Sequence, residues 1–157
     1  YYDGLEEQTA AMVRNMGMQE RIIYSSFNHY SLQKLKAAVP EARIGLLMGQ
    51  NFVDVPGYTN LLQAEAVHPY FQTVDKDYIV RCHAHGIQVN TWTVDAKIEM
   101  KRLTEAGADA IITDCPDSAR KIVDGDYSII PPPPKPPALR TRIKERFKRE
   151  AINWLNR

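Results

Sequence analysis

The sequence predicts an α/β protein whose strands form one parallel sheet. Residues 86–114 read as strand, helix, strand within one short stretch. The same alternation runs through the rest of the chain, where apolar β-branched runs are separated by segments with the three-to-four-residue period of a helix. Strands that alternate with helices favour a parallel sheet and argue against a sandwich or a helical bundle.

Residues 86–114 carry the clearest pattern. The β-branched and aromatic run 87–94 is typical of a buried strand, and Asp95 after it is suited to an N-cap. Residues 108–113 form a second short apolar strand, and strands joined by a helix pair in parallel with a right-handed crossover. Four residues would share the inward face of the helix between the strands: Ala96, Met100, Leu103 and Gly107.

The N-terminal part is predicted to contain two helices and two strands. A first helix with apolar residues on one face ends at Gly17. Residues 21–27 (RIIYSSF) form a strand, and Asn28 is placed to cap a helix that stops at Pro40. Residues 43–48 (RIGLLM) form a buried strand. His29 lies at the start of the second helix, where we expect it to be solvated.

The middle of the chain continues the alternation. The loop 49–57 leads to a short helix near 58–64 and to a brief extended segment, 66–68, that Pro69 closes. Asp75 is placed to cap the next helix. Pro116 begins a last helix that runs to Val123, because proline is tolerated in a first helical turn.

Charge divides the chain into two parts. The net charge is +1, but residues 140–157 hold seven Lys or Arg against two Glu, so this segment carries +5 and the rest carries −4. A neutral to acidic domain argues against nucleic acid as a partner of the domain. The two cysteines, Cys82 and Cys115, form no CxxC pair and indicate neither a disulfide framework nor a zinc site. We therefore expect a cytoplasmic protein with reduced thiols.

The end of the chain predicts a linker and a separate helix. Residues 131–137 (PPPPKPP) are typical of a stiff polyproline spacer. We divide the chain into a domain (1–127), a proline-rich linker (128–138) and a basic amphipathic helix (139–157). This helix is either packed on the domain or solvated, or it is a membrane-surface anchor with Phe147 and Trp154 in the interface and basic residues on anionic headgroups.

Four segments together carry a family resemblance. SSFNHYSLQKLKAAVPEARIGLL, VHP, HAHGIQVNTWTVD and GADAIITDCPD resemble the C-terminal half of the glycerophosphodiester phosphodiesterase (GDPD) family, over residues 1–124. The resemblance implies the C-terminal half of a TIM (β/α)8 barrel with its active site at the carboxyl ends of the strands. It also implies metal-dependent hydrolysis of glycerophosphodiesters, such as glycerophosphocholine, to glycerol 3-phosphate and an alcohol.

The catalytic motifs of that family are missing from this sequence. Its His-Arg pair, its Glu-x-Asp pair and its downstream His-Asp, which supply the ligands of a divalent cation (Mg or Ca) and the acid and base groups, do not occur. Whole barrels have about 250 residues. We expect a truncated half with no metal site and no catalytic residue, inactive by itself, whose partners are the missing N-terminal half and a small glycerophosphodiester. The first residue, Tyr1, is not methionine, which indicates an N-terminus that is not the natural one.

Half a barrel leaves two sheet edges unpaired, so we expect it to be marginally stable, oligomeric or unfolded without its other half. Two hypotheses stay open. The chain is either part of a phosphodiesterase or a non-catalytic barrel remnant that acts as a membrane-surface or oligomerisation module.

Candidate substrate-binding residues lie at predicted carboxyl ends of strands. The resemblance implies that Trp92 and Phe27 are pocket walls against the glycerol or head group, although both could instead belong to the barrel core. His68 is either a polar pocket contact or a structural histidine. Asp114 suits an N-cap better than a pocket carboxylate. His83 and His85 cannot share one metal ion, because side chains two residues apart on a helix point about 200° apart.

Overall fold

The computed structural model describes residues 3–132 of the 157-residue chain. Its strands form one parallel sheet in the order β1-β2-β3-β4-β5, which is also their order along the chain. Consecutive strands are joined through a helix, which confirms the predicted α/β fold. The strands are β1 (Tyr24–Ser26), β2 (Ile44–Met48), β3 (Ala66–Pro69), β4 (Gln88–Thr91) and β5 (Ala110–Ile111).

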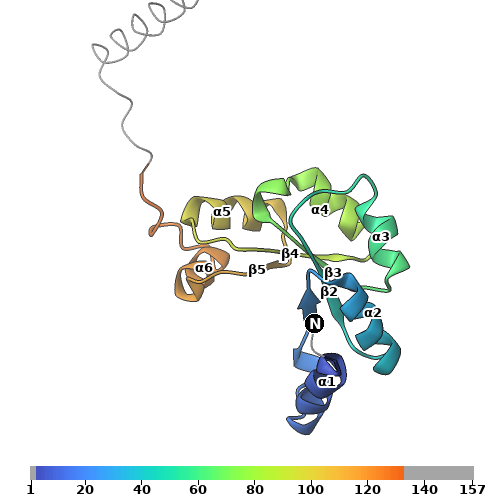
Figure 1. The fold of residues 1–157 in the computed structure, drawn as a ribbon. Coiled ribbons are helices and arrows are strands. Elements are labelled where there is room, and N and C mark those ends of the chain that lie inside the picture. Colours follow the sequence, from blue (N-terminus) through green and yellow to red (C-terminus); the bar gives the residue numbers. More distant parts are fainter. Residues whose placement is uncertain (1–2, 133–157) are drawn as a thin grey trace, which may run out of the picture.

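Helices α2 to α5 follow one another around one side of the sheet, and α1 and α6 lie toward its two ends (Figure 1). Two short 3-10 helices, Gln19–Arg21 and Phe71–Thr73, precede β1 and α4. The α-helices are α1 (Leu5–Asn15), α2 (His29–Ala38), α3 (Val55–Leu61), α4 (Lys76–His83), α5 (Lys97–Ala106) and α6 (Pro116–Val123).

The core lies between the sheet and helices α2 to α5. Successive strand residues alternate between the two faces of a sheet, and Ile44, Leu46 and Met48 of β2 all point to the helix side, where each is at most 3 % exposed. Val67 and Val89 continue this buried layer across β3 and β4. The opposite face carries Ser25, Gly45, Ala66 and Gln88 in one register row. In a closed barrel that face would be the interior.

Strands are shorter than predicted. Strands were predicted over residues 21–27, 87–94 and 108–113. Only part of each run is strand in the structure, namely the residues of β1, β4 and β5 given above. Strand length depends on which neighbour is available for pairing, and β1 and β5 each have one neighbour in the described sheet. After β4, a single bridge joins Trp92 to Tyr70.

The prediction for α3 was wrong in position. The helix starts at Val55, because Asp54 caps it by accepting a hydrogen bond from Gly57 N at 2.9 Å and Pro56 fits the first turn. The predicted cap of α4 is confirmed, because Asp75 accepts from Tyr78 N at 2.7 Å. Asn28 lies at the N-cap position of α2 as predicted, but its side chain makes no capping hydrogen bond. Gly107 ends α5 with a φ of 97°, which favours glycine.

The apolar face of α1 is largely open. Leu5, Met12 and Met16 are 51 %, 64 % and 63 % exposed, and Ala10 is the buried residue of this helix. The predicted helix is therefore confirmed. In the described part of the chain, α1 packs mainly against α2.

The far C-terminal predictions fall mostly outside the described residues. Ile129 and Ile130 still pack against the core, whereas most of the predicted linker and the whole helix predicted at 139–157 lie beyond residue 132. Within residues 3–132, no helix is both long and apolar enough to cross a membrane.

Candidate functional site

Three aromatic side chains meet where β1, β3 and β4 end. Phe27 and Trp92 make an edge-to-face contact with ring centroids 5.3 Å apart, and the Tyr70 and Trp92 centroids are 5.5 Å apart. The Trp92 indole N–H donates to the main-chain oxygen of His68 at 2.6 Å. Phe27 is 61 % exposed, while Trp92 and Tyr70 are half-buried. The structure thus brings together the predicted residues Phe27, His68 and Trp92, whose contact with a ligand stays a prediction.

The His68 side chain lies on the sheet face opposite the helices and joins three strands. Asn90 Nδ2 lies 3.0 Å from its Nε2, and Ser25 Oγ lies 2.8 Å from its Nδ1. Because an amide nitrogen can only donate, Nε2 is the acceptor, and the neutral ring donates from Nδ1 to Ser25. His68 is 5 % exposed, and this burial lowers its pKa to about 4.

Gly45 makes this arrangement possible. His68 reaches across β2 to Ser25 on β1, and a Cβ at Gly45 would lie 2.4 Å from His68 Nε2. The ring is neutral at pH 7 because its burial lowers the pKa. Both ring nitrogens are bonded to protein groups, and these bonds link β1, β3 and β4. This geometry favours the structural role that the sequence left open beside a pocket contact.

His29 is half-buried and hydrogen-bonded to protein groups, whereas the sequence predicted a solvated side chain. Its Nε2 donates to the main-chain oxygen of Leu47 at 3.0 Å, and its Nδ1 lies 2.9 Å from the Tyr58 hydroxyl. The start of α2 is therefore hydrogen-bonded both to the end of β2 and to α3. Tyr58 also packs against Phe52, with ring centroids 5.4 Å apart. No fixed sequence spacing links these residues, so the sequence pattern could not have paired them.

Neither Asp95 nor Asp114 caps a helix, contrary to prediction. Ala96 occupies the N-cap position of α5, and Asp95 Oδ1 instead accepts from Thr113 Oγ1 and Asp114 N, both at 2.9 Å. Cys115 occupies the N-cap position of α6, because Pro116 is the first helical residue. Asp95 therefore ties the loop after β4 to the loop after β5.

The two remaining histidines have separate partners. His83 Nε2 lies 2.8 Å from Asp109 Oδ2, and His85 Nδ1 donates to the main-chain oxygen of Arg81 at 3.0 Å. Between residues 3 and 132, no group of three or more His, Cys, Asp or Glu side chains could hold a metal ion. The described residues therefore do not fit the divalent cation that the resemblance implies.

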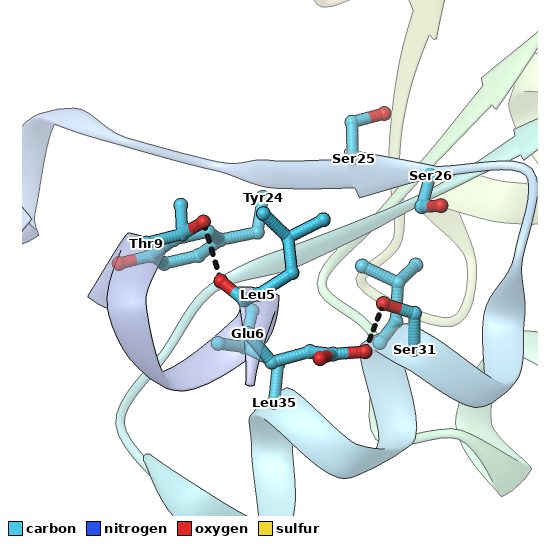
Figure 2. Close-up of a pocket in the computed structure, with 9 residues that line it drawn as sticks. Leu5, Glu6, Thr9, Tyr24, Ser25, Ser26, Ser31 and Leu35 are labelled. Carbon is cyan, nitrogen blue, oxygen red and sulfur yellow. Dashed lines mark hydrogen bonds between the residues drawn. The ribbon is translucent and has the colours of Figure 1, made fainter. Parts of the chain in front are cut away.

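A cavity of about 160 Å³ lies elsewhere, between α1, α2 and β1 (Figure 2). Leu5 and Leu35 form apolar walls, and Glu6 accepts a hydrogen bond from Ser31 at 2.6 Å. Figure 2 shows the Ser25 side chain pointing away from the other labelled side chains of this cavity. The Ser25 hydroxyl is hydrogen-bonded to His68 instead. This cavity is a packing space between helices and is separate from the aromatic site.

The described residues at the ends of β1, β3 and β4 offer aromatic and hydrogen-bonding surface for contact with a ligand. Three aromatic rings gather there, and the buried His68 is kept neutral by its burial and is hydrogen-bonded to Ser25 and Asn90. Asn90 and Tyr70 were missed by the sequence analysis. Each lies two residues from a predicted site residue, so strand alternation could have placed Asn90 on the face of Trp92 and Tyr70 on the face of His68.

Comparison with known proteins gives a consistent result. The Glycerophosphoryl diester phosphodiesterase family matches residues 4–118. A glycerophosphodiester phosphodiesterase of Caldanaerobacter subterraneus is 35 % identical over 122 residues, which are 78 % of this chain and 50 % of that protein. The chain spans about half the length of the curated relatives it matches.

Two solved structures have the fold of this chain over about half of their own length. A putative glycerophosphodiester phosphodiesterase from Galdieria sulphuraria matches with a TM-score of 0.72 and 23 % identity, over 79 % of this chain and 52 % of that one. An Oleispira antarctica phosphodiesterase, solved in complex with the product sn-glycerol-3-phosphate, matches with a TM-score of 0.67 and 25 % identity, over 78 % and 52 % of the two chains.

Proposed function

Because this chain belongs to the glycerophosphoryl diester phosphodiesterase family, we propose that it forms the C-terminal half-barrel of an enzyme that hydrolyses glycerophosphodiesters to glycerol 3-phosphate and an alcohol. The observation that carries the proposal is that the matching region is about half of each relative and contributes five neighbouring barrel strands. The cation ligands and the acid and base groups are then supplied by residues other than 3–132.

In this proposal the described residues form one wall of the substrate pocket. Phe27 and Trp92 present aromatic surface at the carboxyl ends of β1 and β4, where the ligands of (β/α)8 barrels bind. His68 holds Trp92 through its main-chain oxygen and holds β1 through Ser25. Glycerol 3-phosphate in the Oleispira protein is a ligand of the size and chemistry that such a wall would contact.

Complementation tests the proposal. This chain is mixed, by co-expression, with the half of the Caldanaerobacter relative that it does not match, and hydrolysis of glycerophosphocholine is measured with magnesium or calcium present. We expect no turnover by the chain alone and measurable release of glycerol 3-phosphate by the mixture. Trp92→Ala in this chain is expected to lower that activity by about tenfold or more, because a stacked ring is lost.

Two results would count against it. Clear turnover by this chain alone would show that the catalytic groups are not missing from it. A folded mixture that leaves glycerophosphodiesters intact would support the other hypothesis, a non-catalytic module.

A membrane contact through residues 139–157 is a further prediction. The segment lies outside the described residues, and its sequence combines basic side chains with Phe147 and Trp154. Co-sedimentation with vesicles containing anionic lipid, with and without residues 138–157, checks it. We expect the full chain to sediment with vesicles and the shortened chain to stay in solution, whereas equal behaviour of both would contradict the prediction.

A further inference from the structure

An open cavity of about 460 Å³ lies beside the Phe27–Trp92 pair, between the segment that joins β1 to α2 and helix α3. We call it the aromatic cavity. None of its lining residues is Lys, Arg, Asp or Glu, and three of the five carry phenyl or phenol rings. The lining residues are Phe27, Asn28, His29, Tyr30 and Tyr58.

The rings of the aromatic cavity are unusually open to solvent. Tyr30 is 79 % and Phe27 is 61 % exposed, and Phe52, which packs on Tyr58, is 49 % exposed. Single exposed apolar residues need no explanation, but a contiguous group around a concave surface marks a binding site. These rings come from four separate segments: the loop after β1, the start of α2, the loop before α3, and α3 itself.

The cavity is also held in shape before any ligand arrives. The His29 ring is hydrogen-bonded through Nδ1 to the Tyr58 hydroxyl and through Nε2 to the main-chain oxygen of Leu47. These bonds fix the Tyr58 ring relative to β2. A preformed site loses less conformational entropy on binding than one that must be ordered.

We propose that the aromatic cavity binds a quaternary ammonium group, the choline head group of a glycerophosphodiester. This assignment rests on the proposed function and names the preferred substrate class. A quaternary ammonium is attracted to the faces of aromatic rings and has no N–H donor that would need an acceptor. A primary ammonium, as in ethanolamine, is strongly hydrated and is best bound by carboxylates. The five lining residues have none, while the acidic residues nearby line the neighbouring cavity that shares Asn28 and Tyr30.

The position of the cavity fits this substrate. Phe27 lines it and also contacts Trp92, so the cavity continues the proposed glycerophosphate wall without a break. A head group bound there would lie next to the Phe27–Trp92 pair. The cavity is thus suited to the leaving alcohol of the diester.

Titration of the full chain with choline chloride tests the proposal, with amide chemical shifts around residues 27–30 and 58 as the readout. Ethanolamine hydrochloride at the same ionic strength is the ligand control. We expect choline to bind about tenfold more tightly than ethanolamine. Tyr30→Ala should weaken choline binding by about threefold to tenfold, since one exposed cation–π contact is lost.

The matched control is Tyr127→Ala, which removes another partly exposed tyrosine, one that lies under Lys101 and away from the cavity. It should leave choline affinity unchanged. Tyr30 is so exposed that its removal should not unfold the chain, and retained shift dispersion verifies this. Equal affinity for choline and ethanolamine, no shifts with choline, or an unaltered affinity in Tyr30→Ala would each overturn the proposal.

The complemented enzyme separates this inference from the proposed function. Hydrolysis of glycerophosphocholine and glycerophosphoethanolamine with equal kcat/KM would sink the choline site and leave the phosphodiesterase intact. If the complemented protein binds choline but hydrolyses neither glycerophosphocholine nor glycerophosphoethanolamine, the choline site stands and the proposed phosphodiesterase function fails.

Discussion

At the scale of single residues, one histidine and one glycine define the inner face of the sheet. His68 can hydrogen-bond to Ser25 two strands away because Gly45 between them has no side chain. The ring is buried, neutral and bonded at both nitrogens. A substitution of Gly45 should therefore displace the His68 ring.

Gly45→Ala should destabilise the fold. The new Cβ would lie 2.4 Å from His68 Nε2 and would push the ring off Ser25, at a cost of about 1–3 kcal/mol. Urea unfolding measures the loss. Gly49→Ala serves as the control, since a Cβ there would meet nothing within 4 Å. Similar stability of the two variants would contradict the proposed contact.

Stability should fall as the pH is lowered from about 6.5 toward 4. The folded pKa of His68, about 4, lies below its ordinary value, so in this window the unfolded chain binds a proton that the folded chain does not, and folding is disfavoured. The loss contributed by His68 is on the order of 3 kcal/mol at most. Urea unfolding at several pH values checks this.

His68→Gln isolates that contribution from the other histidines. The variant should be less stable at pH 7, because the bonds to Ser25 and Asn90 are weakened, but its stability should depend less on pH between 4 and 6.5. An identical pH dependence in both proteins would show that His68 does not titrate as described.

The sequence could place His68 at a strand end but could not show its partners. Ser25 and Asn90 lie 43 and 22 residues away along the chain, and their approach depends on sheet register. The same holds for His29, whose contacts with Leu47 and Tyr58 were missed because they come from tertiary packing.

At the scale of elements, residue type alone was an uneven guide to helix ends. Asp75 caps α4 as predicted, whereas Asp95 has donors on a neighbouring loop that only the folded sheet brings near. A carboxylate binds whichever N–H or O–H groups lie closest. Asp95 consequently links β4 to the loop after β5.

Asp95→Ala should loosen the loop after β5. Two hydrogen bonds to the carboxylate are lost, which should cost about 1 kcal/mol at this exposed site. The Asp114 amide should exchange with solvent about fivefold to tenfold faster, as measured by hydrogen exchange. Asp114→Ala is the control, because it keeps the backbone N–H that Asp95 accepts. Unchanged exchange in Asp95→Ala would show that this contact does not order the loop.

At the scale of the whole molecule, the fold class could be predicted from the sequence, whereas the lengths of the strands could not. The alternation of strands and helices, with the family motifs, predicted the half-barrel that the structure shows. The strand lengths could not be predicted, because they depend on neighbours that pair with each edge. Within the described sheet, β1 and β5 have one neighbour each, and Ala110 on β5 is exposed.

Open edges should make the chain associate with itself. In the sheet formed by residues 3–132, the outer N–H and C=O groups of β1 and β5 have no neighbouring strand and can pair with a strand of another molecule. A lysine on an edge strand opposes such pairing. We expect sedimentation velocity to show concentration-dependent association of the full chain, and a larger monomer fraction for Ala110→Lys. Ala37→Lys, on the exposed side of α2, controls for the added charge. If both lysine variants associate as the parent does, or if the parent is monomeric throughout, the edges are not the interface.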